Sequence, residues 1–167
     1  IEPDTLEPTV FDTVAKFIYT DRGLYLGIHN KQPADTLLER LTKRDKYINR
    51  DGNTIMIDTS GESLYGLWFD VNLGGALADG KILPEKTFTN NWDGAWEGDS
   101  ARTDEGWTAE YFLPWSMMAM PESERDRKMG VFLMRRVAHR DETWSWPGIP
   151  FTASKFMSAM YPIHMQD

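Results

Sequence analysis

Residues 64–72 read LYGLWFDVN, and this stretch decides the fold class. Because side chains of a β-strand alternate between its two faces, one face of the stretch carries only apolar or aromatic side chains, those of Tyr65, Leu67, Phe69 and Val71. The opposite face is mixed and carries Trp68 and Asp70. This pattern is typical of a sandwich strand whose inner face lies in a core, while its Trp-bearing outer face is either covered or used.

Strand-like segments recur on both sides of this stretch. Residues 53–59 and 64–72 flank the turn at residues 60–63, and residues 15–20 and 24–30 flank Asp21-Arg22-Gly23, so both pairs are expected to form hairpins. Four more strands are expected, over residues 95–102, 107–113, 130–138 and 142–146. Helix is minor, with one short helix expected over residues 36–43 and a single turn over 115–120. The sequence therefore predicts an all-β protein, an antiparallel two-sheet β-sandwich.

Length and composition favour one folded domain over residues 1–167. A chain of 167 residues that is 41% hydrophobic, with seven Trp, can bury one sizeable core.

The net charge of −8 (18 basic and 26 acidic residues) disfavours a nucleic-acid partner. The longest uncharged run, residues 143–154, contains two prolines and is far shorter than the about 20 apolar residues of a membrane-spanning helix. The absence of cysteine is compatible with the cytosol or the periplasm. No basic-then-apolar leader follows Ile1, so we expect a piece excised from a longer chain.

Catalytic motifs are absent from the sequence. There is no nucleophile elbow, phosphate loop, dinucleotide fingerprint or zinc helix, and His29, His139 and His164 lack metal-ligand spacing. Glu97 and Glu110 could be nominated as a glycosidase pair, but 26 acidic residues produce such pairs by chance. We therefore expect that this domain is not an enzyme.

Aromatic residues gather in segments that are rich in amides and acids. Trp92 and Trp96 lie in NNWDGAWEGD (residues 90–99), Trp144 and Trp146 lie in ETWSWPGIPF (residues 142–151), and Tyr47 precedes a strand. Flat rings stack on the C–H faces of a pyranose while neighbouring polar groups bond its hydroxyls. The alternative is core packing, which strand-spaced tryptophans also serve. Oxygen ligands for a hard cation could come from Asp51, Asn53, Asp93, Asp99 or Asp104, although no contiguous calcium loop is present.

Seven segments occur in a recognisable order: LYLGIHN, the D-x-x-x-I-x-I-D strand at residues 51–58, FDVN, WDGAW, DEGWTAEYFLPW, GVFLMRRV and WSWP. Over residues 15–163 this set resembles the family 9 carbohydrate-binding module-like domains of the DOMON-like β-sandwich group. The combination W-D-x-x-W and G-W-T-x-E resembles the subset found at the N-terminus of larger bacterial envelope proteins. The resemblance thus implies a periplasmic, outer-membrane or extracellular location, and an adjoining domain of the parent chain as a partner.

The resemblance also implies a binding site, an aromatic sandwich around a terminal sugar. By position, the first ring falls at Ile48, beside Tyr47, and the second falls near Phe151. Thr54 stands where the family has a carboxylate, and Asp70 where it has a basic residue. We expect carbohydrate binding by seven residues: Tyr47, Arg50, Asp51, Asn72, Trp92, Trp146 and Phe151. No cofactor is expected to be required, and the resemblance implies that a structural calcium ion is possible.

Three functions are open at this point. The first is a non-catalytic domain that binds poly- or oligosaccharide and helps a parent protein in glycan binding or carbohydrate breakdown. The second is a structural or protein-interaction sandwich that has lost the sugar site and meets its partner through Trp68 and the Met-rich end, Met157, Met160 and Met165. The third is a haem-binding DOMON domain in which His29 or His139 pairs with a methionine.

Overall fold

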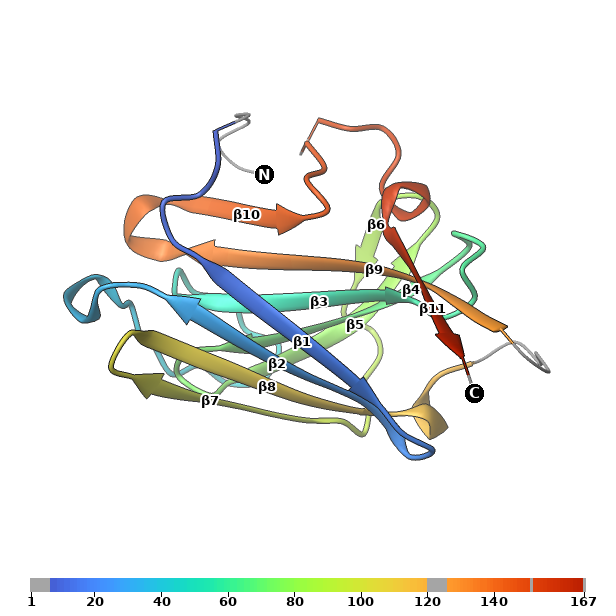
Figure 1. The fold of residues 1–167 in the computed structure, drawn as a ribbon, viewed down its shortest axis with the longest axis horizontal. Coiled ribbons are helices and arrows are strands. Elements are labelled where there is room, and N and C mark those ends of the chain that lie inside the picture. Colours follow the sequence, from blue (N-terminus) through green and yellow to red (C-terminus); the bar gives the residue numbers. More distant parts are fainter. Residues whose placement is uncertain (1–6, 120–125, 151, 167) are drawn as a thin grey trace.

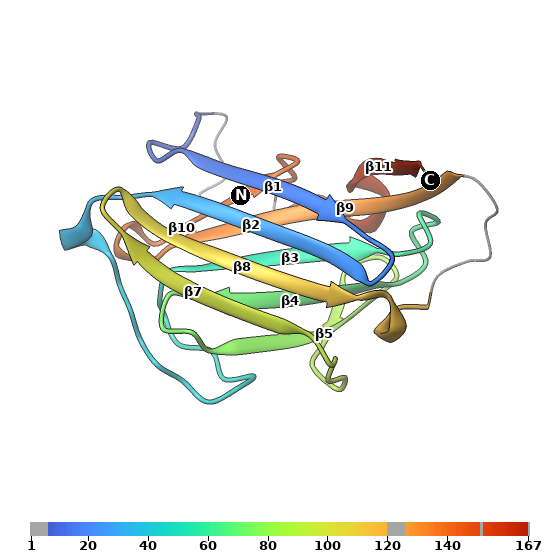
Figure 2. The same ribbon diagram turned by 60° about the horizontal axis from the view of Figure 1, so that its bottom comes forward.

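The computed structural model of the protein describes residues 7–119, 126–150 and 152–166. Its strands form two antiparallel sheets that pack face to face (Figures 1 and 2). The first sheet has four strands in the order β1-β2-β8-β7, with bounds Thr13–Tyr19, Gly23–Lys31, Gly106–Pro114 and Glu97–Thr103. The predicted all-β, two-sheet antiparallel sandwich is therefore confirmed.

The second sheet has seven strands and carries the features described below. Its main order is β10-β9-β3-β4-β5-β6, with bounds Glu142–Trp146, Asp126–Val137, Gly52–Asp58, Gly66–Asn72, Leu77–Leu83 and Thr87–Thr89. The seventh strand, β11 (Tyr161–Gln166), pairs with the first half of β9, whereas β10 pairs with the second half. All eight expected strands are present, and β5, β6 and β11 are additional because their sequences lack a clean alternation.

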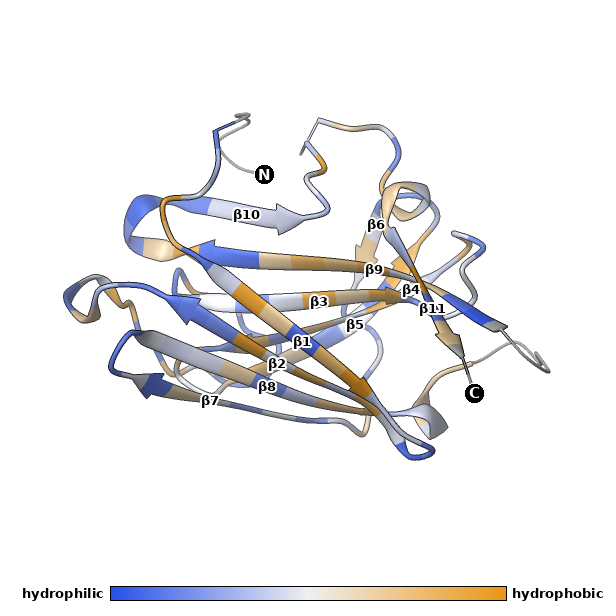
Figure 3. Ribbon diagram, viewed as in Figure 1, coloured by the Kyte–Doolittle hydropathy of each residue, from blue (hydrophilic) through white to orange (hydrophobic). Residues whose placement is uncertain are grey.

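The core between the sheets follows the alternation that the sequence predicted. In β4, Leu67, Phe69 and Val71 are at most 3% exposed and pack in this inner core. In β3, Ile55 and Ile57 are buried in the same layer. Trp107 is fully buried here. The hydropathy colouring shows these apolar positions along the central strands, with hydrophilic residues at turns and strand ends (Figure 3).

A second, smaller apolar cluster covers part of the outer face of the seven-stranded sheet. Met56 and Phe132 reach it from β3 and β9, and the segment between β10 and β11 folds over it. This segment contains the 3₁₀ turn η4 (Met157–Ala159). Met157 and Met160 are buried in this cluster, and Met165 is buried in the inner core. The Met-rich end is therefore not an exposed partner surface, since the protein's own strands cover it.

The helix expected over residues 36–43 was wrong. Only the 3₁₀ turn η1 (Ala34–Thr36) forms, and the chain then runs in an irregular loop. Leu38 donates its N–H to the Asp51 carboxylate at 2.7 Å and accepts the Asp51 N–H at 3.0 Å, so its backbone is held by a distant residue. The expected turn after Pro114 is present as η2 (Trp115–Met117). The remaining turn, η3 (Ala138–Arg140), joins β9 to β10. No helix in the described ranges combines the length and hydropathy that crossing a membrane requires.

Arg135 on β9 ties the two sheets together near the start of β1. Arg135 is only 3% exposed, and its guanidinium donates to the carbonyls of Phe11, Asp12 and Lys31. It also donates to the side chains of Thr13 and Gln32. Burial lowers the pKa of Arg135 to about 10, against a smaller opposing effect of the Asp51 carboxylate. This one buried guanidinium therefore links the start of β1 to β9, in addition to the pairing of β1 with β2.

Candidate functional site

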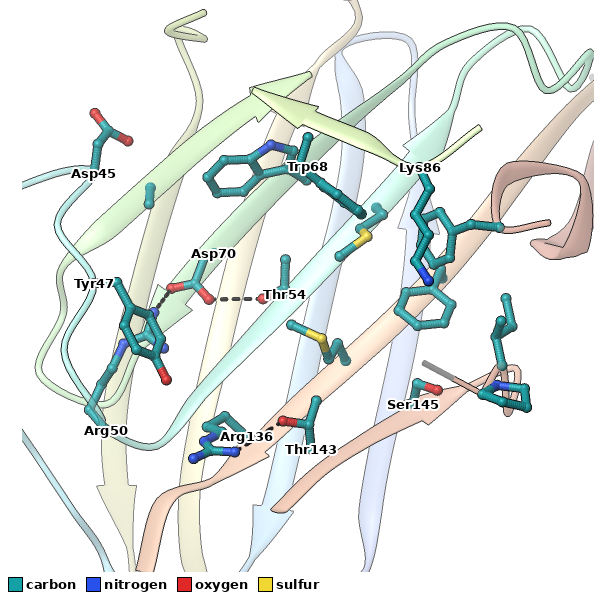
Figure 4. A pocket seen from close by; sticks show the side chains of 18 of the residues that line it. Asp45, Tyr47, Arg50, Thr54, Trp68, Asp70, Lys86, Arg136, Thr143 and Ser145 are labelled. Carbon is teal, nitrogen blue, oxygen red and sulfur yellow. Dashed lines mark hydrogen bonds and ion pairs between the residues drawn. The ribbon is translucent and has the colours of Figure 1, made fainter. Parts of the chain in front are cut away.

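A cavity of about 610 Å³ opens on the outer face of the seven-stranded sheet (Figure 4). Its floor is made by outward-facing side chains of β3, β4, β9 and β10. The loop that precedes β3 forms one wall, and the β5–β6 turn with the segment after β10 forms the other. Its volume lies in the range of about 300–1,000 Å³ that is usual for small-molecule sites. Trp68 lies on this face, so the outer face of β4, within residues 64–72, lines a cavity.

The strand register arranges the floor in rows across the sheet. In the first row Thr143 lies opposite Arg136. Two residues further along the strands, the second row runs Ser145, Met134, Thr54, Asp70 and Ala78. The third row runs Phe132, Met56 and Trp68. Successive rows are about 6.8 Å apart, because each strand residue rises about 3.4 Å.

A buried ion pair lies at the centre of the polar part of the floor. Arg50 donates to one oxygen of Asp70, and the Thr54 hydroxyl donates to the other oxygen at 2.8 Å. Both side chains are largely buried, with 7% of Arg50 and 11% of Asp70 exposed. Burial raises the pKa of Asp70, although the charge of Arg50 and the hydrogen bonds from Thr54 and Arg50 partly oppose the rise. The floor thus presents a carboxylate, whose remaining lone pairs can accept hydrogen bonds from ligand hydroxyls, paired with a guanidinium, whose N–H groups can donate to them.

An exposed aromatic ring stands over this ion pair. Tyr47 is 70% exposed, and the Arg50 guanidinium lies 5.0 Å from the centre of its ring. A cation under the ring face is attracted to it and restricts its orientation. On the opposite side of the polar end, Arg136 donates to Thr143 at 3.3 Å and pairs with Asp141. A planar apolar surface and several hydrogen-bonding groups therefore face one space.

The other end of the cavity is apolar. Phe132 meets Phe156 edge to face at 4.9 Å between ring centres, and Phe88 lies 5.6 Å from Phe156. The nearby polar groups are engaged within the protein: Trp68 donates its indole N–H to the Thr89 carbonyl, and Ser145 donates to the Pro147 carbonyl. This end therefore offers a surface of rings and thioethers with few groups for hydrogen bonding.

Of the six predicted site residues that the structure describes, two line this cavity, Tyr47 and Arg50. Asp51 is fully buried, and its oxygens accept the N–H groups of Leu38 and Ala138 instead of facing the solvent. Asn72 is 1% exposed and accepts the N–H of Ala76 in the β4–β5 turn. Both side chains therefore satisfy loop backbone, a role that the sequence motif does not distinguish from ligand binding.

The predicted aromatic residues also separate in space. Trp92 packs edge-on against the buried Phe69, with ring centres 6.0 Å apart, so it belongs to the end of the inner core. Trp146 is 45% exposed but lies beside Tyr161, at the rim of a second cavity of about 380 Å³ between β1 and β10. Strand alternation explains this, because Thr143 lines the first cavity and Trp144 and Trp146 line the second, with Ser145 at the boundary of both. Phe151 lies outside the described residues.

Most of the cavity was missed by the sequence reasoning. The unexpected lining residues are Met56, Trp68, Phe88, Phe132, Met134, Arg136, Thr143 and Phe156, together with Thr54 and Asp70, which were noted only as replacements of family residues. One signal was present: Trp68 and Asp70 share the outer face of residues 64–72. Their partners come from strands far apart in the sequence, and only the register identifies them.

One group of carboxylates has a spacing that suits a cation. Oxygens of Asp45, Asp79 and Asp93 lie within 4.8 Å of one another, and only Asp93 was among the expected calcium ligands. Arg44 already lies among them, 3.0 Å from the buried Asp79 carboxylate and 3.6 Å from Asp93. Asp79 also accepts the Gly94 N–H and the Trp96 indole N–H. As arranged, these residues fit the guanidinium of the protein itself better than the six to eight oxygens that calcium prefers.

The nominated catalytic pair lies elsewhere. Glu97 on β7 and Glu110 on β8 are exposed on the four-stranded sheet, and neither lines the cavity of about 610 Å³ or that of about 380 Å³.

The fold of this chain is similar to that of family 9 carbohydrate-binding modules, and the resemblance seen in the sequence is confirmed for the fold. A "putative carbohydrate-binding protein" from Bacteroides uniformis has a TM-score of 0.70 at 13% identity, covering 88% of this chain and 74% of that chain. A family 9 carbohydrate-binding module from Caldicellulosiruptor kristjanssonii in complex with glucose has a TM-score of 0.62 at 12% identity, covering 94% and 78%. The module from the same organism with cellotriose gives 0.59 at 12% identity, covering 84% and 66%. No family model matches the sequence, and no curated protein matches it.

Proposed function

We propose that the protein is a non-catalytic carbohydrate-binding domain, and that the cavity on the outer face of the seven-stranded sheet is its binding site. The observation that carries this proposal is the convergence of Tyr47 with the Arg50–Asp70 pair on one open cavity. A pyranose has C–H faces that stack on a ring and a rim of hydroxyls that pair with carboxylate and guanidinium groups. The arrangement supplies both kinds of partner at one place.

The structural neighbours support the same class of ligand. Two of them are carbohydrate-binding modules in complex with glucose and with cellotriose. This chain has Thr54 where the family has a carboxylate and Asp70 where the family has a basic residue. In this chain the positive charge beside Asp70 comes from Arg50. We therefore expect the polar groups to be present in a different arrangement, so that the preferred sugar differs from those two ligands.

The affinity is expected to be modest. Each sugar hydrogen bond replaces one to water and contributes only about 0.5–1.5 kcal/mol net. One exposed ring with a few such bonds corresponds to dissociation constants from millimolar to high micromolar, or about −4 to −6 kcal/mol.

The proposed cellular context is a larger bacterial envelope or secreted protein that this domain holds on polysaccharide or glycan during carbohydrate breakdown. The ordered motifs that resemble the N-terminal domains of such proteins support this context. Cell fractionation with an antibody against the domain tests it, and recovery in the cytosolic fraction alone would contradict it.

Calorimetric titration against a panel of neutral and acidic mono- and oligosaccharides, including glucose and cellotriose, tests the binding proposal. For a sugar that binds, Tyr47→Ala is expected to weaken the affinity at least fivefold, because it removes the exposed ring of the site. Tyr19→Ala is the matched control, since Tyr19 is 46% exposed on β1 in the other sheet. No binding across the panel, or equal effects of the two variants, would overturn the proposal.

A further inference from the structure

The cavity is polar at one end and apolar at the other along the direction of the strands, and this difference restricts which ligands fit it. The polar row, Thr143 and Arg136, lies at one end, and the apolar row, Phe132, Met56 and Trp68, lies two rows away. The spacing between the outer rows is about 13.6 Å, from four residues at about 3.4 Å each. The close-up shows Tyr47, Arg50 and Arg136 toward one end, and Trp68 and Lys86 toward the other (Figure 4).

The same gradient is visible in the strands themselves. The hydropathy colouring of β9 is hydrophilic near its C-terminal end and hydrophobic toward its middle (Figure 3), and Arg136 belongs to that C-terminal end. Along β3 the outward-facing positions change from Thr54 to Met56 in the direction of the chain. Because neighbouring strands are antiparallel and in register, the apolar ends of β3, β4 and β9 coincide. The division of the cavity is thus a property of the whole sheet and not of one side chain.

The rings of the apolar end offer no hydrogen-bonding partners to the hydroxyls of a second sugar unit. Phe156 contacts both Phe88 and Phe132, and the Lys86 ammonium, which also lines the cavity, donates to the Ala153 carbonyl. A hydroxyl pressed against this surface would lose its water partners without gaining others, which disfavours binding. An apolar group at the same place would instead remove its own surface and that of the rings from water.

From this polarity, and resting on the proposed function, we infer that the ligand is a glycoside or sugar ester with an apolar substituent. Its sugar lies under Tyr47, and its aryl or alkyl group lies against the rings of Phe88, Phe132 and Phe156. A pyranose covers about one row spacing, so the substituent of a sugar bound over the second row reaches the third. The cavity volume of about 610 Å³ accommodates both parts. A purely polar oligosaccharide would leave the apolar end in contact with water or with unsatisfied hydroxyls.

Calorimetry with matched pairs of probes tests this inference. Methyl, phenyl and hexyl glycosides of β-D-glucose, β-D-galactose, α-D-mannose and β-D-xylose are titrated into the protein, with 3-phenyl-1-propanol as the probe that lacks a sugar. For at least one sugar, the phenyl or hexyl glycoside is expected to bind at least tenfold more tightly than the methyl glycoside. Phe88→Ala is expected to reduce this ratio at least threefold, whereas Tyr19→Ala leaves it unchanged, because Phe88 is 45% exposed at the apolar end.

The outcomes separate the inference from the function on which it rests. Equal binding of methyl and apolar glycosides would overturn the inference and leave carbohydrate binding supported. A ratio that Phe88→Ala does not change would also overturn it, since the apolar group would then bind elsewhere. Equal affinity for 3-phenyl-1-propanol and the phenyl glycosides, or no binding by any glycoside, would overturn the proposed function together with the inference.

Discussion

Arg50→Met is expected to destabilise the protein because it leaves the Asp70 carboxylate buried without its cation. Asp70 is only 11% exposed, and of its two side-chain partners it would keep the hydrogen bond from Thr54. Two unit charges about 4 Å apart interact by about 4 kcal/mol at an effective dielectric constant of about 20. Removal of one member of a buried pair typically costs about 3–5 kcal/mol. With the Thr54 bond retained, we expect a loss of about 3 kcal/mol in unfolding free energy at pH 8.

The cost of Arg50→Met should also depend on pH. Burial already raises the pKa of Asp70 above its ordinary value of 3.8, with Arg50 opposing the rise, so the variant raises this pKa further. A carboxyl whose pKa is higher in the folded state stabilises the fold below its unfolded pKa, and this contribution is lost as the pH rises through the folded pKa. The destabilisation by Arg50→Met should therefore be smaller at pH 5 than at pH 8.

Urea unfolding followed by tryptophan fluorescence at pH 5 and pH 8 measures this effect. Asp70→Asn, which leaves Arg50 buried and charged, is expected to cost about as much with no comparable dependence on pH. The double variant should recover at least about 2 kcal/mol relative to the sum of the single variants, because neither buried charge is left alone. A cost below about 1 kcal/mol at pH 8, or a cost that is equal at both pH values, would refute the role assigned to this pair.

Three further predictions concern the supports of the fold. Arg44→Met should lower the unfolding free energy by about 2–4 kcal/mol, because it leaves the buried Asp79 carboxylate without its cation. Asp93→Asn should change the unfolding free energy by less than about 0.5 kcal/mol, because the Asp93 side chain is 76% exposed. Urea unfolding measures both. The thermal midpoint of the wild type should differ by less than about 1 °C between EDTA and calcium chloride, since Arg44 already supplies a cation to this carboxylate group, and a larger rise with calcium in differential scanning fluorimetry would contradict this. Arg135→Met should cost about 3–5 kcal/mol and speed amide exchange in β1, because five hydrogen bonds from one buried guanidinium are lost, two of them to the carbonyls of Phe11 and Asp12 just before the strand.

Much of the fold could be predicted because alternation is a local property. The stretch 64–72 placed Leu67 and Phe69 inside and Trp68 outside from the period of two alone, and the structure agrees. The helix expected over residues 36–43 failed because its leucine spacing is also local, whereas Asp51, which holds Leu38 in an extended loop, is distant in the sequence. Local patterns therefore predicted strands well and failed where a tertiary hydrogen bond decided the backbone.

The site depended on information that no local pattern contains. The family resemblance led to Asp51 and Asn72 as site residues, but both bond to backbone N–H groups. Sequence reasoning placed Trp92 and Trp146 in one site, whereas in the structure Trp92 packs against the inner core and Trp146 lines a separate cavity. Composition identified the kinds of residue that a sugar site needs, and tertiary structure selected which of them face one cavity.

By itself, the sequence determined that the chain is an all-β sandwich, which faces of its strands are apolar, and which family its ordered motifs resemble. Only the tertiary structure decided that Arg50 pairs with Asp70, and that Phe88, Phe132 and Phe156 gather at one end of the cavity. The physical reason is that side-chain alternation follows from the geometry of a single strand, whereas a binding surface follows from the register between strands. That register is set by hydrogen bonds and packing among residues that are far apart in the chain.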